Sequence, residues 1–340
     1  MESNAVPLPQ PLPATGGATA SGKAMKDLPN LGISACLLGE KVRFDGGHKL
    51  DLYLRDVLGV CVNRIPVCPE VECGLTVPRG IMRLVSDTEP PRLITLSSGT
   101  DQTERMMNWT KKRLNNLEKQ NLHGFVFKAR SPSCGMRSVK VYDSLGVPHK
   151  NGIGLFARAF MERFPLIPVE EEGRLGKPEL RENFIERIFV YKRWKEFEKR
   201  RFTAEGLVDF HTNHKLLVMA HHPRNLRFLG RIVSRATNAT LQSAAQRYAE
   251  ILMATMKYAA TVKRNVNVLQ HASGYFKKAL SPDEKQELLE IIGNYQQGLV
   301  PLTAPVTLLR HFVRKFDQPY LRRQFYLNPD PIEQMLRNRV

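Results

Sequence analysis

The first half of the sequence alternates short apolar runs with segments of helical periodicity. Four runs of β-type composition predict strands at residues 31–38, 64–71, 122–131 and 165–173. Three segments with an apolar face predict helices at residues 50–60, 101–121 and 152–164. The second helix is expected to begin at Asp101, because Glu104 follows it at capping-box spacing. This alternation predicts an α/β domain, with a mainly parallel sheet flanked by helices.

The second half has a helical pattern. Residues 183–202 predict a helix that is aromatic on one side and basic on the other. Further on, an apolar stripe that steps by three or four residues predicts one long helix, through Leu241, Ala245, Tyr248, Leu252, Met256, Ala259, Val262, Val266 and Leu269. The chain is therefore expected to divide into a disordered tail at 1–27, the α/β domain at 28–170, a linker at 171–182 and an all-α domain at 183–340.

Three cysteines lie at the end of a predicted strand or just past it: Cys36, Cys68 and Cys134. Ligands of parallel sheets bind beyond the carboxyl ends of the strands, so these thiols are expected to meet at one edge. An iron–sulfur cluster suits such a set, and so does zinc if Cys73 or a histidine is the fourth ligand. Three unrelated buried thiols are the alternative. Cys61 lies in an apolar run and is predicted to belong to the core.

Composition narrows the class of protein. Five cysteines in 340 residues do not suit a secreted disulfide scaffold and favour a cytoplasmic protein with reduced thiols. No run reaches the roughly 18 apolar residues of a membrane span, and no obligate protein partner is evident. The net charge is +18: residues 1–180 hold 24 basic and 19 acidic residues, and residues 181–340 hold 27 and 14. This basic excess favours a polyanion partner, although solvated basic helix faces have the same composition.

Three motifs resemble the signatures of the thiouracil desulfidase family over roughly residues 30–168: "ISACLLGEKVRFDGGHK", "PVCPEVECGLTVPRG" and "KARSPSCG". A second resemblance, over about residues 185–335, is to an uncharacterised helical domain, and rests on "FHTNHKLLVMAHHPRNLRFLG" and "LLRHFVRKFDQPYLRRQFYLNPDP". The fused arrangement is similar to that of bacterial enzymes that remove sulfur from 4-thiouridine in tRNA.

The resemblance implies a 4Fe–4S cluster held by Cys36, Cys68 and Cys134, with one open, catalytic iron. It also implies that Glu70 and Ser131 act beside that iron. Glu70 would be a general base for water or an acid toward the ring nitrogen, and Ser131 a hydrogen-bond donor. Read locally, Glu70 is a capping carboxylate and Ser131 a turn hydroxyl. Cys73 stands where relatives tend to have glycine, and would either cap the open iron or be an inert neighbour.

Other polar residues are candidates for substrate binding. Asp45 and Lys49 would touch base or phosphate, or belong to a simple tight turn. Arg130 and Ser133 belong to the third motif, near Arg137 and Lys140, where phosphate contacts are useful. In the second half, a phosphate-tracking surface is expected from Lys192, Arg193, Lys195, Lys199, Arg200 and Arg201. The interleaved Tyr191 and Trp194 are more typical of core than of base stacking. A metal site is weighed against RNA contact or packing for His211, His214, His221 and His222.

The sequence thus predicts a cytoplasmic iron–sulfur enzyme that converts 4-thiouridine in tRNA to uridine and hydrosulfide by hydrolysis. One alternative is a desulfidase of free thiouracil. A second, of a different class, is a non-catalytic protein that binds RNA and a metal.

Overall fold

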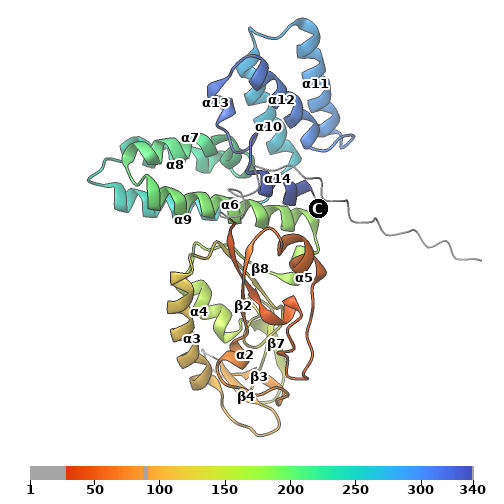
Figure 1. Cartoon of the computed structure of the whole chain (residues 1–340), viewed down its shortest axis with the longest axis vertical. Coiled ribbons are helices and arrows are strands. Elements are labelled where there is room, and N and C mark those ends of the chain that lie inside the picture. Colours follow the sequence, from red (N-terminus) through yellow and green to blue (C-terminus); the bar gives the residue numbers. More distant parts are fainter. Residues whose placement is uncertain (1–27, 87–90, 339–340) are drawn as a thin grey trace, which may run out of the picture.

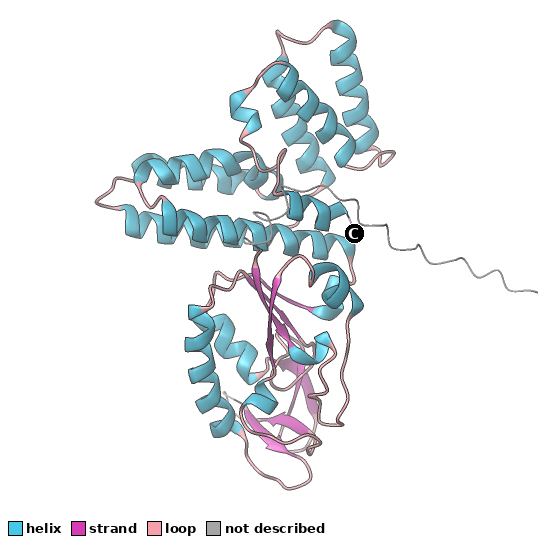
Figure 2. Cartoon of the chain, viewed as in Figure 1, coloured by secondary structure: helices cyan, strands magenta, loops and turns pink. Residues whose placement is uncertain are grey.

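The computed structural model describes residues 28–86 and 91–338, so the predicted tail at 1–27 lies outside the described residues. Figure 2 shows the strands gathered in one part of the molecule, with helices beside them, while the other part is helical. The central sheet has the order β2–β1–β5–β8, and every neighbouring pair is parallel. Its strands are β1 (Asn30–Ser34), β2 (Asn63–Val67), β5 (Gly124–Phe127) and β8 (Val169–Glu171). The predicted α/β fold with a parallel sheet is confirmed.

Apolar residues cover both faces of this sheet. On one face Phe125 and Phe127 contact the rings of Phe156 and Phe160, which belong to α4 (Leu155–Arg163). Next to α4 packs α3 (Thr103–Lys119). On the other face Leu31, Ile33 and Val126 share a buried cluster with η3, a π-helix at Tyr53–Leu58. Cys61 is buried in this cluster, so its prediction as a core residue is confirmed.

The structure also contains a second sheet, which the sequence did not predict. It has the order β4–β3–β6–β7, in which only β3 and β6 are parallel. The strands are β3 (Met82–Val85), β4 (Arg92–Thr95), β6 (Val139–Tyr142) and β7 (Pro148–Gly152). Each has only four or five residues and one exposed face, which gives too short an alternation to stand out in the sequence.

The segment expected as a linker has regular structure. Residues 171–182 contain the end of β8, helix α5 (Glu172–Leu175) and the start of α6 (Pro178–Arg200). Helix α6 packs on the central sheet, because Phe184, Ile185, Ile188 and Phe189 belong to the same cluster as Leu31 and Val126. A Cβ on Gly124 of β5 would lie 3.0 Å from Ile188, so the glycine permits this close approach. The prediction of a linker is therefore wrong. The charged, glycine- and proline-containing composition of this segment does not show that the apolar residues of α6 pack directly on the sheet.

The second half is all-helical, as predicted. In Figure 1, α7 (Ala204–His221), α8 (Pro223–Arg235) and α9 (Leu241–Met256) lie beside α6, and the later helices form a second group. That group comprises α10 (Val262–Ser273), η4 (Gly274–Phe276), α11 (Pro282–Gln296), α12 (Thr303–Lys315) and α13 (Pro319–Arg322), whereas the last helix, α14 (Pro331–Asn338), returns to pack on α6. Across the part of the chain that the structure places, no helix combines the length and the apolar character needed to cross a bilayer.

Two local predictions are wrong. The stripe through Leu241 and Leu269 forms two helices rather than one, because the Thr261 side chain accepts a hydrogen bond from Arg264 N and starts α10. The capping box at Asp101 is not formed either. Gln102 is the N-cap of α3, while the Asp101 carboxylate accepts from Thr103 N and pairs with Arg92, which draws it away from the helix end.

Candidate functional site

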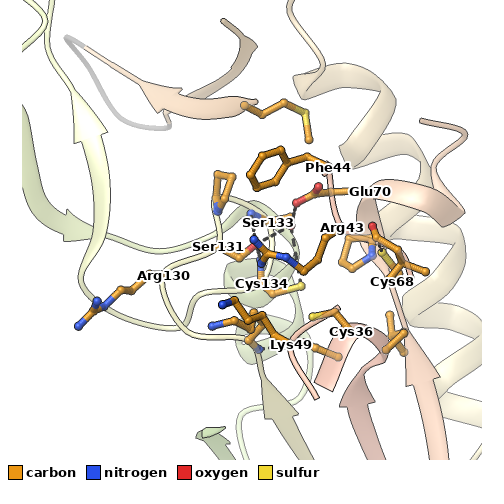
Figure 3. A pocket seen from close by; sticks show the side chains of 18 of the residues that line it. Cys36, Arg43, Phe44, Lys49, Cys68, Glu70, Arg130, Ser131, Ser133 and Cys134 are labelled. Atoms are coloured by element: carbon orange, nitrogen blue, oxygen red, sulfur yellow. Dashed lines mark hydrogen bonds between the residues drawn. The ribbon is translucent and has the colours of Figure 1, made fainter. Parts of the chain in front are cut away.

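The three strand-end cysteines line one cavity of about 380 Å³ (Figure 3). Cys36 lies in η2 (Ala35–Leu38), the 3-10 turn that follows β1. Cys68 lies between β2 and the short helix α2 (Pro69–Glu72), and Cys134 lies in the loop after β5. Because β1, β2 and β5 are parallel neighbours, their carboxyl ends bring these loops together, as the spacing predicted.

Cys134 is buried, Cys36 and Cys68 are partly buried, and the three thiols influence one another. Burial, and then the nearby Cys68 thiol, raises the pKa of Cys36 to about 11. Burial also raises the pKa of Cys68 to about 11. The pKa of Cys134 is raised well above its ordinary value, by burial first and then by Cys68 and Glu70. Such thiols are neutral at pH 7 and become thiolates only beside a strongly positive centre, such as a metal.

Three cysteine thiols at one cavity are the donor type that iron–sulfur clusters use. No group of three or more His, Cys, Asp or Glu side chains in residues 28–86 and 91–338 is placed to hold one metal ion. In a four-iron cluster each cysteine binds a different iron, so its ligands lie farther apart than those of one zinc ion. Cys73 is absent from the residues that line the cavity; it packs against the cluster of Met82 and Met106. Its place fits the inert neighbour of the two interpretations.

Glu70 is fixed from two sides. Ser133 Oγ donates a hydrogen bond to Glu70 Oε1 at 2.7 Å, and Arg79 Nε donates to Oε2 at 3.0 Å. Arg79 also pairs with Oε2 through Nη2. Glu70, Ser133 and Arg79 all line the cavity, so the local interpretation of Glu70 as a surface cap is wrong. The role of Arg79 was missed in the sequence, where its only signal is its place at the end of the second motif, "TVPRG".

Ser131 also lines the cavity, but its hydrogen bonds are local. Its Oγ accepts from Ser133 N and Cys134 N, at 3.2 and 3.1 Å, and shares a hydrogen bond with Ser133 Oγ. Ser131 therefore shapes the turn that carries Cys134, while Ser133 contacts the carboxylate. The turn is backed by Gly154, where a Cβ would lie 2.6 Å from the carbonyl oxygen of Ser133.

The cavity is rich in cations. Glu70 is the one carboxylate among the described residues that line it, against five basic side chains: Arg43, Lys49, Arg79, Lys128 and Arg130. Apolar walls come from Phe44, Ile81 and Met82. Asp45 does not line the cavity: it accepts from Gly47 N at 3.0 Å and pairs with Arg43, so the tight turn is the interpretation that holds. This charge balance suits an anionic cluster and an anionic leaving group.

A groove of about 590 Å³ adjoins the cavity, since Ile81, Met82, Arg130 and Pro132 line both. Its other basic residues are Arg83, Lys140 and Lys150. In Figure 3 Arg130 points away from the cysteines, to the outside of the cavity. Arg137 lies elsewhere and pairs with Glu170. Of the expected phosphate contacts, the structure thus groups Arg130 with Lys140 but not with Arg137.

The histidines of the helical part are structural. His211 Nδ1 lies 3.0 Å from Tyr248 Oη, His214 Nε2 accepts from Arg193, and His221 pairs with Glu186. His222 accepts from Asn225 N and is the N-cap of α8. Since His211, His214 and His221 are buried, the expectation that they contact RNA is wrong, and packing and capping account for all four.

The expected phosphate-tracking surface on α6 is wrong for Lys192 and Arg193, whereas Lys199, Arg200 and Arg201 are exposed and stay candidates. Lys192 is buried and pairs with Glu196, and Arg193 pairs with the buried Glu333. Tyr191 and Trp194 are core residues, as favoured from the sequence. A basic face also lies on α8, whose exposed side carries Arg224, Arg227, Arg231 and Arg235. These arginines have no carboxylate partner in the described part of the chain, and α8 contains no acidic residue.

Comparisons with known proteins find two protein families that match different parts of the chain. Residues 31–172 match the family model of 2-thiouracil desulfurases, and residues 215–331 match DUF1722, a protein family of unknown function. The uncharacterized protein YbgA of Escherichia coli K12 is 28% identical over 141 residues, which is 41% of this chain and 83% of YbgA. The uncharacterized protein YbbK of Bacillus subtilis 168 is 30% identical over 108 residues, which is 30% of this chain and 71% of YbbK.

One solved structure is similar, that of the 4Fe–4S-dependent thiouracil desulfidase TudS. It is 32% identical, and the match covers 44% of this chain and 93% of TudS with a TM-score of 0.36. The motifs around the cavity cysteines lie within the residues that match the desulfurase family. The chain belongs to the 2-thiouracil desulfurase family, with a DUF1722 region after the desulfurase domain.

Proposed function

We propose that this protein is a cytoplasmic iron–sulfur desulfidase that hydrolyses 4-thiouridine in tRNA to uridine and hydrosulfide. The observation that carries the proposal is the cavity of a desulfurase domain in which Cys36, Cys68 and Cys134 meet Glu70 and Ser133. The name of TudS supports the cofactor, because that relative depends on a 4Fe–4S cluster.

The three cavity cysteines would hold the cluster, leaving one iron without a protein ligand. The place of Cys73 outside the cavity lining supports a set of three cysteines. When bound, the cluster supplies an iron with a free coordination position, which acts as a Lewis acid on the carbon–sulfur bond. The surrounding cations balance the negative charge of the thiolate ligands.

The residues around the cavity supply the rest of the chemistry. Both oxygens of Glu70 accept hydrogen bonds, from Ser133 and from Arg79, which suits a general base better than an acid. Glu70 accepts a proton from the attacking water, and the oxygen forms a bond to the ring carbon. The hydroxyl then gives its remaining proton to the sulfur as the C=O bond forms, and the carbon–sulfur bond breaks with its electron pair on the sulfur, which leaves as hydrosulfide. No electron is gained or lost overall. Phe44 and Ile81 offer apolar walls for the planar base.

Two basic surfaces support RNA as the substrate. The groove with Arg83, Arg130, Lys140 and Lys150 lies next to the cavity, where the phosphates around a bound nucleotide would lie. On α8, Arg224, Arg227, Arg231 and Arg235 are spaced by three or four residues and so form one stripe, roughly 16 Å long at 1.5 Å per residue. Such a stripe suits the phosphate backbone of a large RNA. Free thiouracil is the second candidate, because it is the compound in the name of TudS.

The direct test is to reconstitute the full chain anaerobically and incubate it with tRNA that contains 4-thiouridine. We expect loss of 4-thiouridine by nucleoside analysis, with release of hydrosulfide. Cys36→Ala, Cys68→Ala and Cys134→Ala each lose the cluster and the activity, whereas Glu70→Ala keeps the visible absorption of the cluster and loses turnover. A colourless, zinc-loaded wild type that leaves 4-thiouridine unchanged would overturn the proposal.

The choice between RNA and free base is tested with α8. Combining Arg227→Gln, Arg231→Gln and Arg235→Gln should weaken tRNA binding about tenfold or more and flatten its salt dependence. Turnover of free thiouracil should not change. The matched control combines Lys111→Gln, Lys112→Gln and Lys119→Gln, three exposed lysines of α3. Equal effects of the two triple variants on tRNA would remove the role of α8.

A further inference from the structure

Arg79 joins three segments at the floor of the cavity. Its guanidinium bonds Glu70 Oε2 from Nε and Nη2, donates from Nη2 to Val42 O at 2.9 Å, and donates from Nη1 to Thr76 O at 3.2 Å. Its side chain is only 7% exposed. An arginine so enclosed has little rotamer freedom, so its planar fork holds a carboxylate in one orientation.

The carboxylate is held by two residues that approach its two oxygens. Arg79 binds Oε2 and Ser133 binds Oε1. Ser133 alone fixes only one oxygen, so the plane of the carboxylate could still rotate about its bond to Cγ. Arg79 holds the other oxygen, Oε2, through both Nε and Nη2, so Arg79 and Ser133 together fix both oxygens and remove that rotation. The lone pairs of Glu70 that remain then face the cavity.

We propose that Arg79 is a positioning residue for Glu70: it does not touch the substrate, and it acts by fixing the carboxylate that accepts the proton of water. This inference rests on the proposed function, since it takes Glu70 as the general base. It extends that function, because it assigns the orientation of the base to Arg79, a residue of the second motif whose role was not predicted from the sequence.

A merely structural role for Arg79 has a basis too. Val42 O accepts from Arg79 and lies 3.9 Å from Cys68 Sγ, so the loop that carries Arg43 and Phe44 depends partly on the same guanidinium. When Cys68 binds metal, its thiol proton is lost and Arg79 remains as a donor to that carbonyl. The test must therefore separate the orientation of Glu70 from the stability of the loop.

The experiment is a double-mutant cycle on the reconstituted full chain, in which Arg79→Gln is made in the wild type and in Glu70→Asp. In the wild type we expect kcat to fall about 10- to 100-fold, the range that a misplaced catalytic group costs, with KM changed less than twofold. In Glu70→Asp, whose shorter side chain already breaks the contact with Arg79, the same substitution should lower kcat less than threefold. Arg79→Lys should restore only part of the rate, because it cannot form the fork.

Two further measurements do not depend on turnover. The visible absorption of the cluster should be unchanged in Arg79→Gln, and a crystal structure of the cluster-free variant should show the Glu70 carboxylate rotated away from Ser133. The matched control is Arg113→Gln, because Arg113 is 18% exposed and pairs with Glu72 of the same helix α2, at 3.1 Å, without lining the cavity. This control should keep kcat within twofold.

The possible failures can be told apart. If Glu70→Asp and Glu70→Ala are as active as the wild type, the general base of the proposed function is wrong. If those variants are impaired but Arg79→Gln keeps the wild-type kcat, only the positioning role is wrong. Equal losses from Arg79→Gln in both backgrounds, or loss of the cluster spectrum, would show that Arg79 acts on the loop and not through Glu70.

Discussion

At the scale of single residues, the two serines of the third motif have different roles although they lie two positions apart. Ser133 Oγ donates to the Glu70 carboxylate, and Ser131 Oγ accepts from two backbone amides of its own turn. A hydrogen bond to a charged group is worth about 1.5–3 kcal/mol, and a turn or cap hydroxyl about 0.5–2 kcal/mol. Ser133 therefore acts on catalysis as well as on stability, and Ser131 mainly on stability.

This division makes a prediction for the pair Ser133→Ala and Ser131→Ala. Ser133→Ala should lower kcat roughly tenfold, and it should also lower the free energy of unfolding of the cluster-free protein by about 1.5–3 kcal/mol, because it removes a hydrogen bond to a carboxylate. Ser131→Ala should lower the free energy of unfolding by about 1 kcal/mol and reduce kcat by a smaller factor. Each variant is the control for the other. The opposite pattern, with kcat lost mainly in Ser131→Ala, would return the catalytic role to Ser131.

Most of the site could be predicted from the sequence, because its residues lie close together within short motifs. Cys68 and Glu70 lie within three residues, and so do Ser131 and Ser133. What the sequence could not supply is the pairing between motifs. The bond from Ser133 to Glu70 spans 63 positions, and the contact from Arg79 to Glu70 crosses a turn whose path no local pattern reveals. Asp45 was assigned to the substrate because the sequence cannot show that its carboxylate turns back to Gly47.

At the scale of elements, strands were predicted where they are buried. Residues Gly124–Phe127 are all buried, so β5 appears as a continuous apolar run, and the parallel central sheet could be inferred from such runs. The strands of the second sheet expose one face and mix Lys, Arg and Asn with apolar residues. The division of the long apolar stripe into α9 and α10 depends on the Thr261 cap, which interrupts the helix without interrupting the pattern of buried residues.

Helix α7 carries a buried histidine that makes stability depend on pH. Burial, and then the charge of Lys215, lowers the pKa of His211 to about 4 from an unfolded value of 6.5. The folded state thus binds this proton more weakly than the unfolded state. The contribution of neutral His211 to the free energy of unfolding is fully present above pH 6.5 and is lost as the pH falls toward 4. Between pH 7.5 and pH 5 the loss amounts to roughly 2 kcal/mol.

The measurement is urea unfolding of the cluster-free protein at pH 7.5 and pH 5. His211→Gln, which cannot titrate, should reduce the loss of unfolding free energy between these two values by roughly 2 kcal/mol. Burial also lowers the pKa of His214, so part of the pH dependence should persist in this variant. The control is His271→Gln, since His271 is exposed on α10. A pH dependence that is the same in His211→Gln and in the wild type would contradict the assignment.

At the scale of the whole molecule, α6 belongs to both parts of the chain. Its first half, with Ile185 and Ile188, packs on the central sheet, and its second half, with Trp194 and Phe197, packs among α7 and α9. The basic excess of residues 181–340 suggested a separate RNA-binding module, but charge alone cannot show that the helix joining the two parts is buried in each. A cut after residue 180 would remove one face of the desulfurase core, so RNA binding is better tested with surface substitutions than by deletion.

Because α6 is shared, the two parts should unfold together, and the two tryptophans of the chain report on each. Trp109 of α3 packs against Phe156 in the α/β part, and Trp194 packs against Tyr248 in the helical part. In Trp109→Phe and Trp194→Phe, urea unfolding followed by the remaining tryptophan should give coincident midpoints.

Ile188→Ala, which removes the contact of α6 with Gly124, should lower the unfolding free energy by about 2–5 kcal/mol as seen by either tryptophan. The control Val208→Ala, at a side chain that is 46% exposed on α7, should change it by less than about 0.5 kcal/mol. The contrary result would be two separate transitions, with Ile188→Ala shifting only the transition seen by Trp109. It would mean that the desulfurase and DUF1722 regions unfold independently and that α6 does not couple them.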